Sequence, residues 1–240
     1  MKYLKILPAL LFSLFMTQLS FSQSVDDVIN KHVEAVGGLD KINAVKSVRI
    51  TGRFSSEGVE IPTIIIRKGD KIRMDLTIGD RRLVMAYDGA EGWMTNPFGE
   101  KDTPENMNAE DIKDLKETGE WEGRLVNYKA KGSRVELLNN DSGETDYKIK
   151  IITKDNDTDI YFLDASTYLL KKEQSNLTIM EKQVIKELTP GDYKKISGVM
   201  FAMSSETKTS GTNEIQKGKF DKIEVNVKID DSQFKIPPKK

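Results

Sequence analysis

The feature that most limits the fold is an alternation of apolar and polar residues with a period of two. In DKIRMDLTI, residues 70–78, every second residue from Ile72 to Ile78 is apolar, and the residues between them are charged or polar. Residues 48–54 alternate in a similar way. Successive side chains of a strand point to opposite faces, so this pattern predicts strands with one apolar and one solvated face.

Turn signals separate these strands at short intervals, which restricts how the strands can be connected. Tight turns of this kind join antiparallel neighbours, so the chain is predicted to form an antiparallel meander. The signals are Gly69-Asp70, Gly79-Asp80, Asp88-Gly89, Asp141-Ser142-Gly143, Asp155-Asn156-Asp157, Asp164-Ala165-Ser166, Gly191-Asp192, Ser197-Gly198 and Ser210-Gly211.

The first 22 residues have the pattern of a secretory signal peptide. Lys2 and Lys5 precede the apolar stretch ILPALLFSLFMTQL, and small residues flank a cleavage position expected after Ser22. A membrane anchor is the alternative, but the apolar stretch is shorter than the ~20 residues of a spanning helix. We therefore expect export to a bacterial periplasm and a single domain over residues 23–240.

Composition removes several classes of function. The chain contains no cysteine, which excludes a disulfide framework and lipid attachment through an N-terminal cysteine. It has 37 Lys and Arg residues against 38 Asp and Glu residues, and Lys2 and Lys5 would leave with the signal peptide. A slightly acidic domain does not favour nucleic acid as a partner.

Two segments carry a helical pattern. From Val25 to Val36 the apolar residues recur at helical spacing, with Ser24 as the expected N-cap and Gly37-Gly38 as the stop. The second segment is an insert at residues 99–132, which we call the lid insert; AEDIKDLKE and EGRLVNYKAKG within it are both predicted to be helical. A long helical excursion inside a meander indicates a functional lid.

The segment IIIRKGDKIRMDLTIGDRRLVMAYDGAEGWMTNPF resembles the hairpins of the periplasmic outer-membrane lipoprotein-sorting proteins, the LolA-like carriers. The matching residues are Asp88, Gly89, Trp93, Asn96, Pro97 and Phe98. DASTYLLKKE at 164–173, DYKKISGVMF at 192–201 and KIDDSQFKIP at 228–237 are similar to segments of a LolA-like family common in Bacteroidetes.

The resemblance implies a mainly β fold, a curved antiparallel half-barrel with helices over its concave face, and acyl chains bound in an apolar cavity. The expected cavity residues are Ile64, Ile66, Met74, Leu76, Met85, Trp93 and Phe98, and the expected lid residues are Ile112, Leu115, Trp121 and Leu125. Pro97 lacks an N–H and should end its strand. Classical carriers lock the lid through a strand arginine, for which the candidates are Arg53, Arg67, Arg73, Arg81 and Arg82.

Three features of the sequence could indicate catalysis or metal binding, and each has a simpler structural interpretation. His32, the only histidine, lies on the apolar side of the first predicted helix and is interpreted as a packed residue. Asp141-Ser142-Gly143 resembles half of an aspartic-protease dyad and is interpreted as a turn. Asp155, Asp157 and Asp159 imitate the start of a calcium loop, but Ile160 and Ser166 stand where Gly and Glu are needed, so a solvated hairpin is preferred.

Methionines are numerous outside the signal peptide, and they suit a site that accepts flexible chains as well as an ordinary core. They are Met74, Met85, Met94, Met107, Met180, Met200 and Met203, and the resemblance favours the cavity for the first two.

We therefore interpret the chain as a non-enzymatic carrier, for which no metal, cofactor or catalytic residue is expected. Its cargo would be acyl chains of lipoproteins or lipids, and its partners would be sorting proteins at the inner and outer membranes. It should be a monomer that does not span a membrane. A sensor of envelope state with the same fold and an enzyme with a dispersed acidic site are the alternatives.

Overall fold

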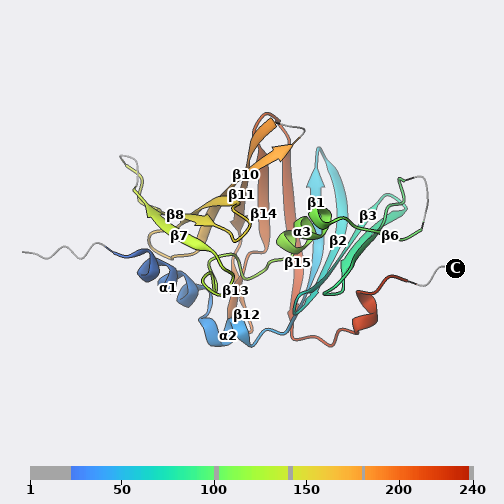
Figure 1. Ribbon diagram of the computed structural model, residues 1–240, viewed down its shortest axis with the longest axis horizontal. Coiled ribbons are helices and arrows are strands. Elements are labelled where there is room, and N and C mark those ends of the chain that lie inside the picture. Colours follow the sequence, from blue (N-terminus) through green and yellow to red (C-terminus); the bar gives the residue numbers. More distant parts are fainter. Residues whose placement is uncertain (1–22, 100–102, 140–142, 180–181, 238–240) are drawn as a thin grey trace, which may run out of the picture.

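The computed structural model describes residues 23–99, 103–139, 143–179 and 182–237 (Figure 1). The predicted signal peptide, the Asp141-Ser142 part of the expected turn, and Met180 lie outside the described residues. No helix within the described ranges is long and apolar enough to cross a membrane.

The prediction of a mainly β, antiparallel fold is confirmed. The main sheet has the order β6-β5-β4-β3-β2-β1-β15-β14-β11-β10-β9-β8-β7, and β12 and β13 form a separate hairpin. Within the described part of the chain, β6 and β7 are the edges of an open sheet (Figure 1). The strands are β1 Ser47–Ser56, β2 Val59–Lys68, β3 Lys71–Ile78, β4 Arg81–Tyr87, β5 Gly92–Thr95, β6 Glu105–Asn106, β7 Arg134–Leu138, β8 Tyr147–Ile152, β9 Thr158–Leu163, β10 Leu170–Ile179, β11 Lys182–Gly191, β12 Lys194–Ile196, β13 Val199–Phe201, β14 Ser204–Thr209 and β15 Ile215–Val225.

Strand register separates the side chains into two faces. Ile65 of β2 pairs with Met74 of β3, which pairs in turn with Met85 of β4, so these three side chains share one face. Ile66 and Trp93 lie on the opposite face. Ile66 pairs with Arg73, Arg73 pairs with Ala86, and Ala86 pairs with Trp93. We call the first the inner face, which the helices cover, and the second the outer face.

The first helix forms where the sequence predicts it. Helix α1, Val25–Val36, is capped by Ser24, whose hydroxyl accepts a hydrogen bond from the Asp27 backbone N–H, while the Asp27 carboxylate accepts one from the Ser24 N–H. Such a capping box satisfies donors that the first turn leaves unpaired. Gly37 follows at a φ of 142°, a conformation that favours glycine. The short helix α2 spans Leu39–Asn43.

The apolar side of α1 belongs to the larger core, on the inner face beside β8 and β9. His32 is buried there, and its Nδ1 lies 2.7 Å from the Tyr168 carbonyl oxygen, so the ring N–H donates a hydrogen bond to that oxygen. Burial lowers the pKa of His32. The core comprises Val28, Ile29, Val33, Val36, Ile42, Val48, Leu125, Val126, Tyr128, Ile149, Ile151, Tyr161, Leu163, Val199, Phe201, Met203 and Ile223.

The lid insert is only partly helical. Helix α3, Ala109–Thr118, confirms the first predicted stretch, and Asn108 caps it by accepting a hydrogen bond from the Asp111 N–H. The second prediction is wrong, because residues 121–132 form turns. Gly123 and Asn127 adopt positive φ values of 78° and 55°, which a right-handed helix cannot contain.

The C-terminal segment crosses the outer face. Ile229 and Phe234 are buried against Ile66, on either side of the short helix η1, Asp231–Gln233. The Trp93 indole N–H donates to the Phe234 carbonyl oxygen at 2.8 Å. Two segments singled out by the resemblance, around Trp93 and at 228–237, therefore meet each other on the outer face.

Candidate functional site

Helix α3 covers an apolar half of the inner face, formed by β1 to β5. Leu115 is buried beneath the helix, and Ile112 packs beside it. Figure 1 shows α3 in front of the middle of the sheet, and strands β3 and β4 are among the elements that it contacts. The cluster under the helix contains Ile65, Ile72, Met74 and Met107, with Ile50, Phe54, Leu76, Met85, Tyr87 and Met94 packed against it.

Two glycines allow α3 to approach the sheet this closely. A Cβ atom on Gly119 would lie 1.8 Å from Ile72 Cδ1, and one on Gly92 would lie 2.4 Å from Ile112 Cγ1. Both distances are far shorter than a van der Waals contact. The fit between helix and sheet therefore depends on the absence of side chains at these two positions.

The structure divides the predicted cavity residues between the two faces. Met74, Leu76 and Met85 lie on the inner face under α3, whereas Ile64 and Ile66 lie on the outer face. The expectation that all of them line one cavity is therefore wrong, because adjacent strand positions alternate in direction and Ile65 is the isoleucine that points inward.

Two aromatic residues of the predicted cavity also lie elsewhere. Trp93 is buried on the outer face against Val84 and Ala86. Phe98 follows the end of β5 and is 53% exposed, with the Arg81 guanidinium 5.4 Å from its ring centroid. Strand β5 ends at Thr95, two residues before Pro97. Neither aromatic ring belongs to the cluster beneath α3.

The four predicted lid residues fall into two groups. Ile112 and Leu115 face the apolar half, as described above. Trp121 stacks on Phe201 with ring centroids 5.2 Å apart, and Leu125 is completely buried in the core beside α1. The second group therefore belongs to a permanent core, while the first covers a separate apolar surface.

Arg67 fastens the C-terminal end of α3 to the sheet. Its Nη1 donates to the Gly119 carbonyl oxygen at 2.7 Å. Among the five candidate strand arginines, Arg67 is the one that hydrogen-bonds the backbone of the described part of the lid insert. The others bond elsewhere: Arg53 to Glu60 and Asp221, Arg73 to Asp75 and Gln233, Arg81 to Pro97, and Arg82 to Asp75.

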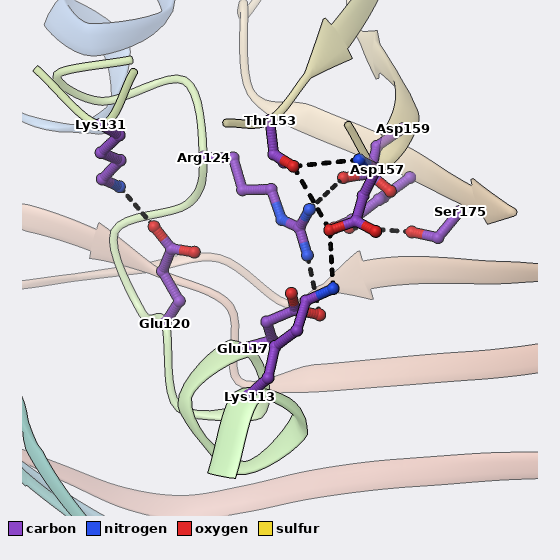
Figure 2. Close-up of polar contacts among 10 residues, drawn as sticks. Lys113, Glu117, Glu120, Arg124, Lys131, Thr153, Asp157, Asp159 and Ser175 are labelled. Atoms are coloured by element: carbon purple, nitrogen blue, oxygen red, sulfur yellow. Dashed lines mark hydrogen bonds and ion pairs between the residues drawn. The ribbon is translucent and has the colours of Figure 1, made fainter. Parts of the chain in front are cut away.

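A group of charged residues fastens the other side of α3 to the β8–β9 hairpin (Figure 2). Lys113 Nζ lies 2.8 Å from Asp157 Oδ2. Arg124 bridges two carboxylates, with Nη2 2.9 Å from Glu117 Oε2 and Nη1 2.6 Å from Asp159 Oδ2. Polar contacts thus join α3 to β2 on one side and to the β8–β9 hairpin on the other.

Buried acids accompany this bridge. Burial raises the pKa of Glu173 to about 7, and the charge of nearby Asp159 acts in the same direction. Burial also raises the pKa of Asp159 and of Glu117, although the charge of Arg124 opposes both shifts. The Lys113 ammonium, in contrast, lowers the pKa of Asp157. The inner face therefore has an apolar half under α3 and a charged region near β9 and β10.

Sequence reasoning did not identify Arg124, Asp159 and Glu173 as parts of this site. The sequence predicts a solvated hairpin at Asp157 and Asp159, whose spacing imitates a calcium loop. The hairpin is present, but Asp159 is only 2% exposed and forms an ion pair with Arg124. Within the described ranges, no group of three or more His, Asp or Glu side chains is placed to hold a metal ion.

Comparison with known proteins identifies the fold. No protein-family model matches the chain, and no curated protein sequence matches it. A LolA superfamily protein from Nitrosomonas europaea superposes with a TM-score of 0.59 at 12% identity, covering 88% of this chain and 97% of the other. A domain from Vibrio parahaemolyticus, described as an outer membrane lipoprotein-sorting protein, gives 0.58 at 12% identity, with coverages of 87% and 94%.

A DUF1329 family protein from Desulfovibrio piger is similar to the same extent, with a TM-score of 0.57, 12% identity and coverages of 89% and 98%. The chain therefore has the LolA-like fold, an open antiparallel half-barrel, as the resemblance of its hairpins predicted. Identity this low establishes the architecture, and function has to be argued from the site.

Proposed function

We propose that the chain is a periplasmic carrier that binds acyl chains of a lipoprotein or lipid on the inner face beneath α3. The observation that carries the proposal is the way α3 covers this face. Its apolar side packs on flexible side chains such as Met74 and Met85. Its attachments to the walls are a few separable polar contacts, through Arg67, Lys113 and Glu117.

An acyl chain would replace α3 on this surface. Permanent exposure of the apolar half would promote association, so a cover is needed whenever cargo is absent. Binding exchanges helix contacts for acyl contacts, which keeps the net affinity moderate and allows release. Export through the predicted signal peptide and a non-enzymatic role are parts of the same proposal.

A crosslink can test whether α3 must move. A Cβ on Gly92 would lie 2.4 Å from Ile112 Cγ1, so cysteines at these two positions are close enough for a disulfide. The chain has no cysteine of its own, so the pair Gly92→Cys and Ile112→Cys cannot mispair with a native thiol. The measurement is titration of the oxidised and reduced variant, residues 23–240, with lauroyl glycerol or a synthetic lipopeptide.

We expect the reduced variant to bind and the oxidised variant to lose binding by at least about tenfold. The single variant Ile112→Cys, treated with the same oxidant, is the matched control and should bind in both conditions. Equal binding by the oxidised and reduced double variant would contradict a carrier in which α3 opens. Circular dichroism of both forms checks that the sheet is intact.

A further inference from the structure

Helix α3 presents two chemically different groups to the inner face. Ile112 and Leu115 pack on the apolar half, whereas Glu117 extends its carboxylate toward Arg124. An apolar stretch with an anionic group at one side is also the chemical pattern of an anionic amphiphile. In the closed state, α3 thus occupies positions that such a ligand could fill.

Arg124 belongs to the part of the lid insert that remains with the core. Leu125 beside it is completely buried next to α1, and Trp121 stacks on Phe201. The Arg124 side chain is only 14% exposed. Movement of α3 away from the sheet would therefore remove Glu117 and leave the guanidinium in place.

The two carboxylates on Arg124 would part when α3 moves. Asp159 lies on β9 and keeps its ion pair with Nη1, but Nη2 loses the Glu117 oxygen at 2.9 Å (Figure 2). A guanidinium group left without its anionic partner in a largely buried place is costly, and an anionic oxygen of a ligand restores the ion pair. Phosphate and carboxylate groups match the planar donor geometry of arginine well.

We infer that Arg124 is a head-group subsite of the inner face and that it selects amphiphiles with an anionic head, which takes the place of Glu117. This inference rests on the proposed function, because the acyl part of the ligand must displace Ile112 and Leu115. It specifies the ligand further. The acyl chain would occupy the apolar half that α3 covers in the closed state, and a phosphate or carboxylate group would contact Nη2 of Arg124.

The experiment compares lauroyl glycerol phosphate with lauroyl glycerol, which differ only in the phosphate. Both are titrated below their critical micelle concentrations into residues 23–240 by calorimetry, at about pH 6, where Glu173 is mostly protonated because its pKa is about 7. A charged hydrogen bond predicts roughly tenfold or tighter binding of the phosphate compound. Inorganic phosphate alone should not bind at the same concentrations.

Variants separate the subsite from the lid. Arg124→Met with Asp159→Asn removes the guanidinium without leaving Asp159 as an unpaired buried charge, and it should reduce the preference for phosphate to about one. Arg124→Lys, which keeps the charge, provides a second variant that should retain part of the preference. Lys113→Met breaks a different contact of α3, and it should tighten binding of both ligands without changing their ratio.

The outcomes are distinguishable. Equal affinities of the wild-type chain for the two lauroyl compounds would overturn the subsite while leaving the carrier proposal intact. Failure to bind either compound would overturn the carrier proposal and the subsite together. Tight binding of inorganic phosphate alone, or a preference that persists in the double variant, would place the anion elsewhere and refute the role of Arg124.

Discussion

The two helical covers of the inner face differ in how they are attached. Helix α1 and residues 121–132 share a core in which Val28, Leu125 and Val199 are completely buried. Helix α3 contributes only Leu115 as a buried residue, and polar contacts hold both of its sides. The same sheet therefore carries a permanent core at one end and a separable cover near the other.

The difference shows that position on a half-barrel does not decide what a helix does. A helix that contributes many buried apolar side chains cannot leave the sheet without unfolding the domain. The free energy needed to open such a region locally approaches the free energy of global unfolding. A cover with few buried side chains and several hydrogen bonds can open at a lower cost. If this difference is real, variants in the core and variants under α3 should respond differently to denaturant and in hydrogen exchange.

The largest effect is expected for Leu125→Ala. The side chain is completely buried in the core beside α1, so its truncation should lower the free energy of unfolding by about 3 kcal/mol. Urea denaturation followed by circular dichroism measures the change. Ile112→Ala is the matched variant under α3 and should cost clearly less globally while increasing amide exchange in 109–118. Equal global losses would remove the distinction between core and cover.

Glu173→Gln should have the next largest effect, and it should depend on pH. The folded pKa is about 7 against an ordinary value near 4.5, so the folded state binds the proton more tightly. The stability from this proton is then fully present below pH 4.5 and is lost as the pH rises through 7, by roughly 3 kcal/mol. The glutamine variant should lose this decline. If the free energy of unfolding changes with pH in the same way for both proteins from pH 4.5 to 8, the raised pKa of Glu173 is disproved.

Gly119→Ala should loosen α3 with a smaller loss. The new Cβ would meet Ile72 Cδ1 at 1.8 Å, but that methyl ends a flexible side chain, so about 1 kcal/mol is expected. Hydrogen exchange across 109–118 should accelerate roughly fivefold, while exchange in α1 stays unchanged. Adding Ile72→Val, which removes the Cδ1 methyl, should restore protection. An equal acceleration in α1 would show that the two covers are coupled.

The smallest effect is expected for Arg67→Met. It removes one hydrogen bond to the Gly119 carbonyl oxygen, which contributes about 0.5–1 kcal/mol to closure. Amide exchange near the C-terminal end of α3 and the affinity for lauroyl glycerol should both rise slightly. Arg53→Met, which breaks ion pairs away from the lid, is the control. The same response in both variants would deny Arg67 a specific part in holding α3.

Local patterns were enough to predict much of the fold. The alternation in 70–78 predicted β3 and its inner face, and Ser24 with Gly37 predicted both ends of α1. These features depend on neighbours a few residues apart, so they can be read from the chain directly. The turn signals alone predicted an antiparallel meander. The LolA-like half-barrel was implied by the resemblance of residues 64–98 and of three later segments to that family.

The helical spacing of apolar residues gave a wrong prediction for residues 122–132, where a few residues set the backbone conformation. Residues 122–132 have apolar spacing typical of a helix, yet Gly123 and Asn127 take positive φ values and the segment forms turns. Glycine and asparagine are the residue types that tolerate this conformation, so a signal was present. Burial of Leu125 and Tyr128 against α1, which stabilises the turns, could not be anticipated from their spacing.

The amino-acid pattern was enough to predict strands at 48–54 and 70–78, the first helix, the helical start of the lid insert and the absence of a disulfide framework. The face that each isoleucine of TIIIRK occupies depends on the folded chain, because the C-terminal segment buries Ile66 from outside while α3 covers Ile65 from inside. The tertiary structure also decided that Trp93 bonds Phe234 and that Arg124 joins Glu117 to Asp159. Such contacts join residues far apart along the chain, and their partners are selected by the path of the folded backbone.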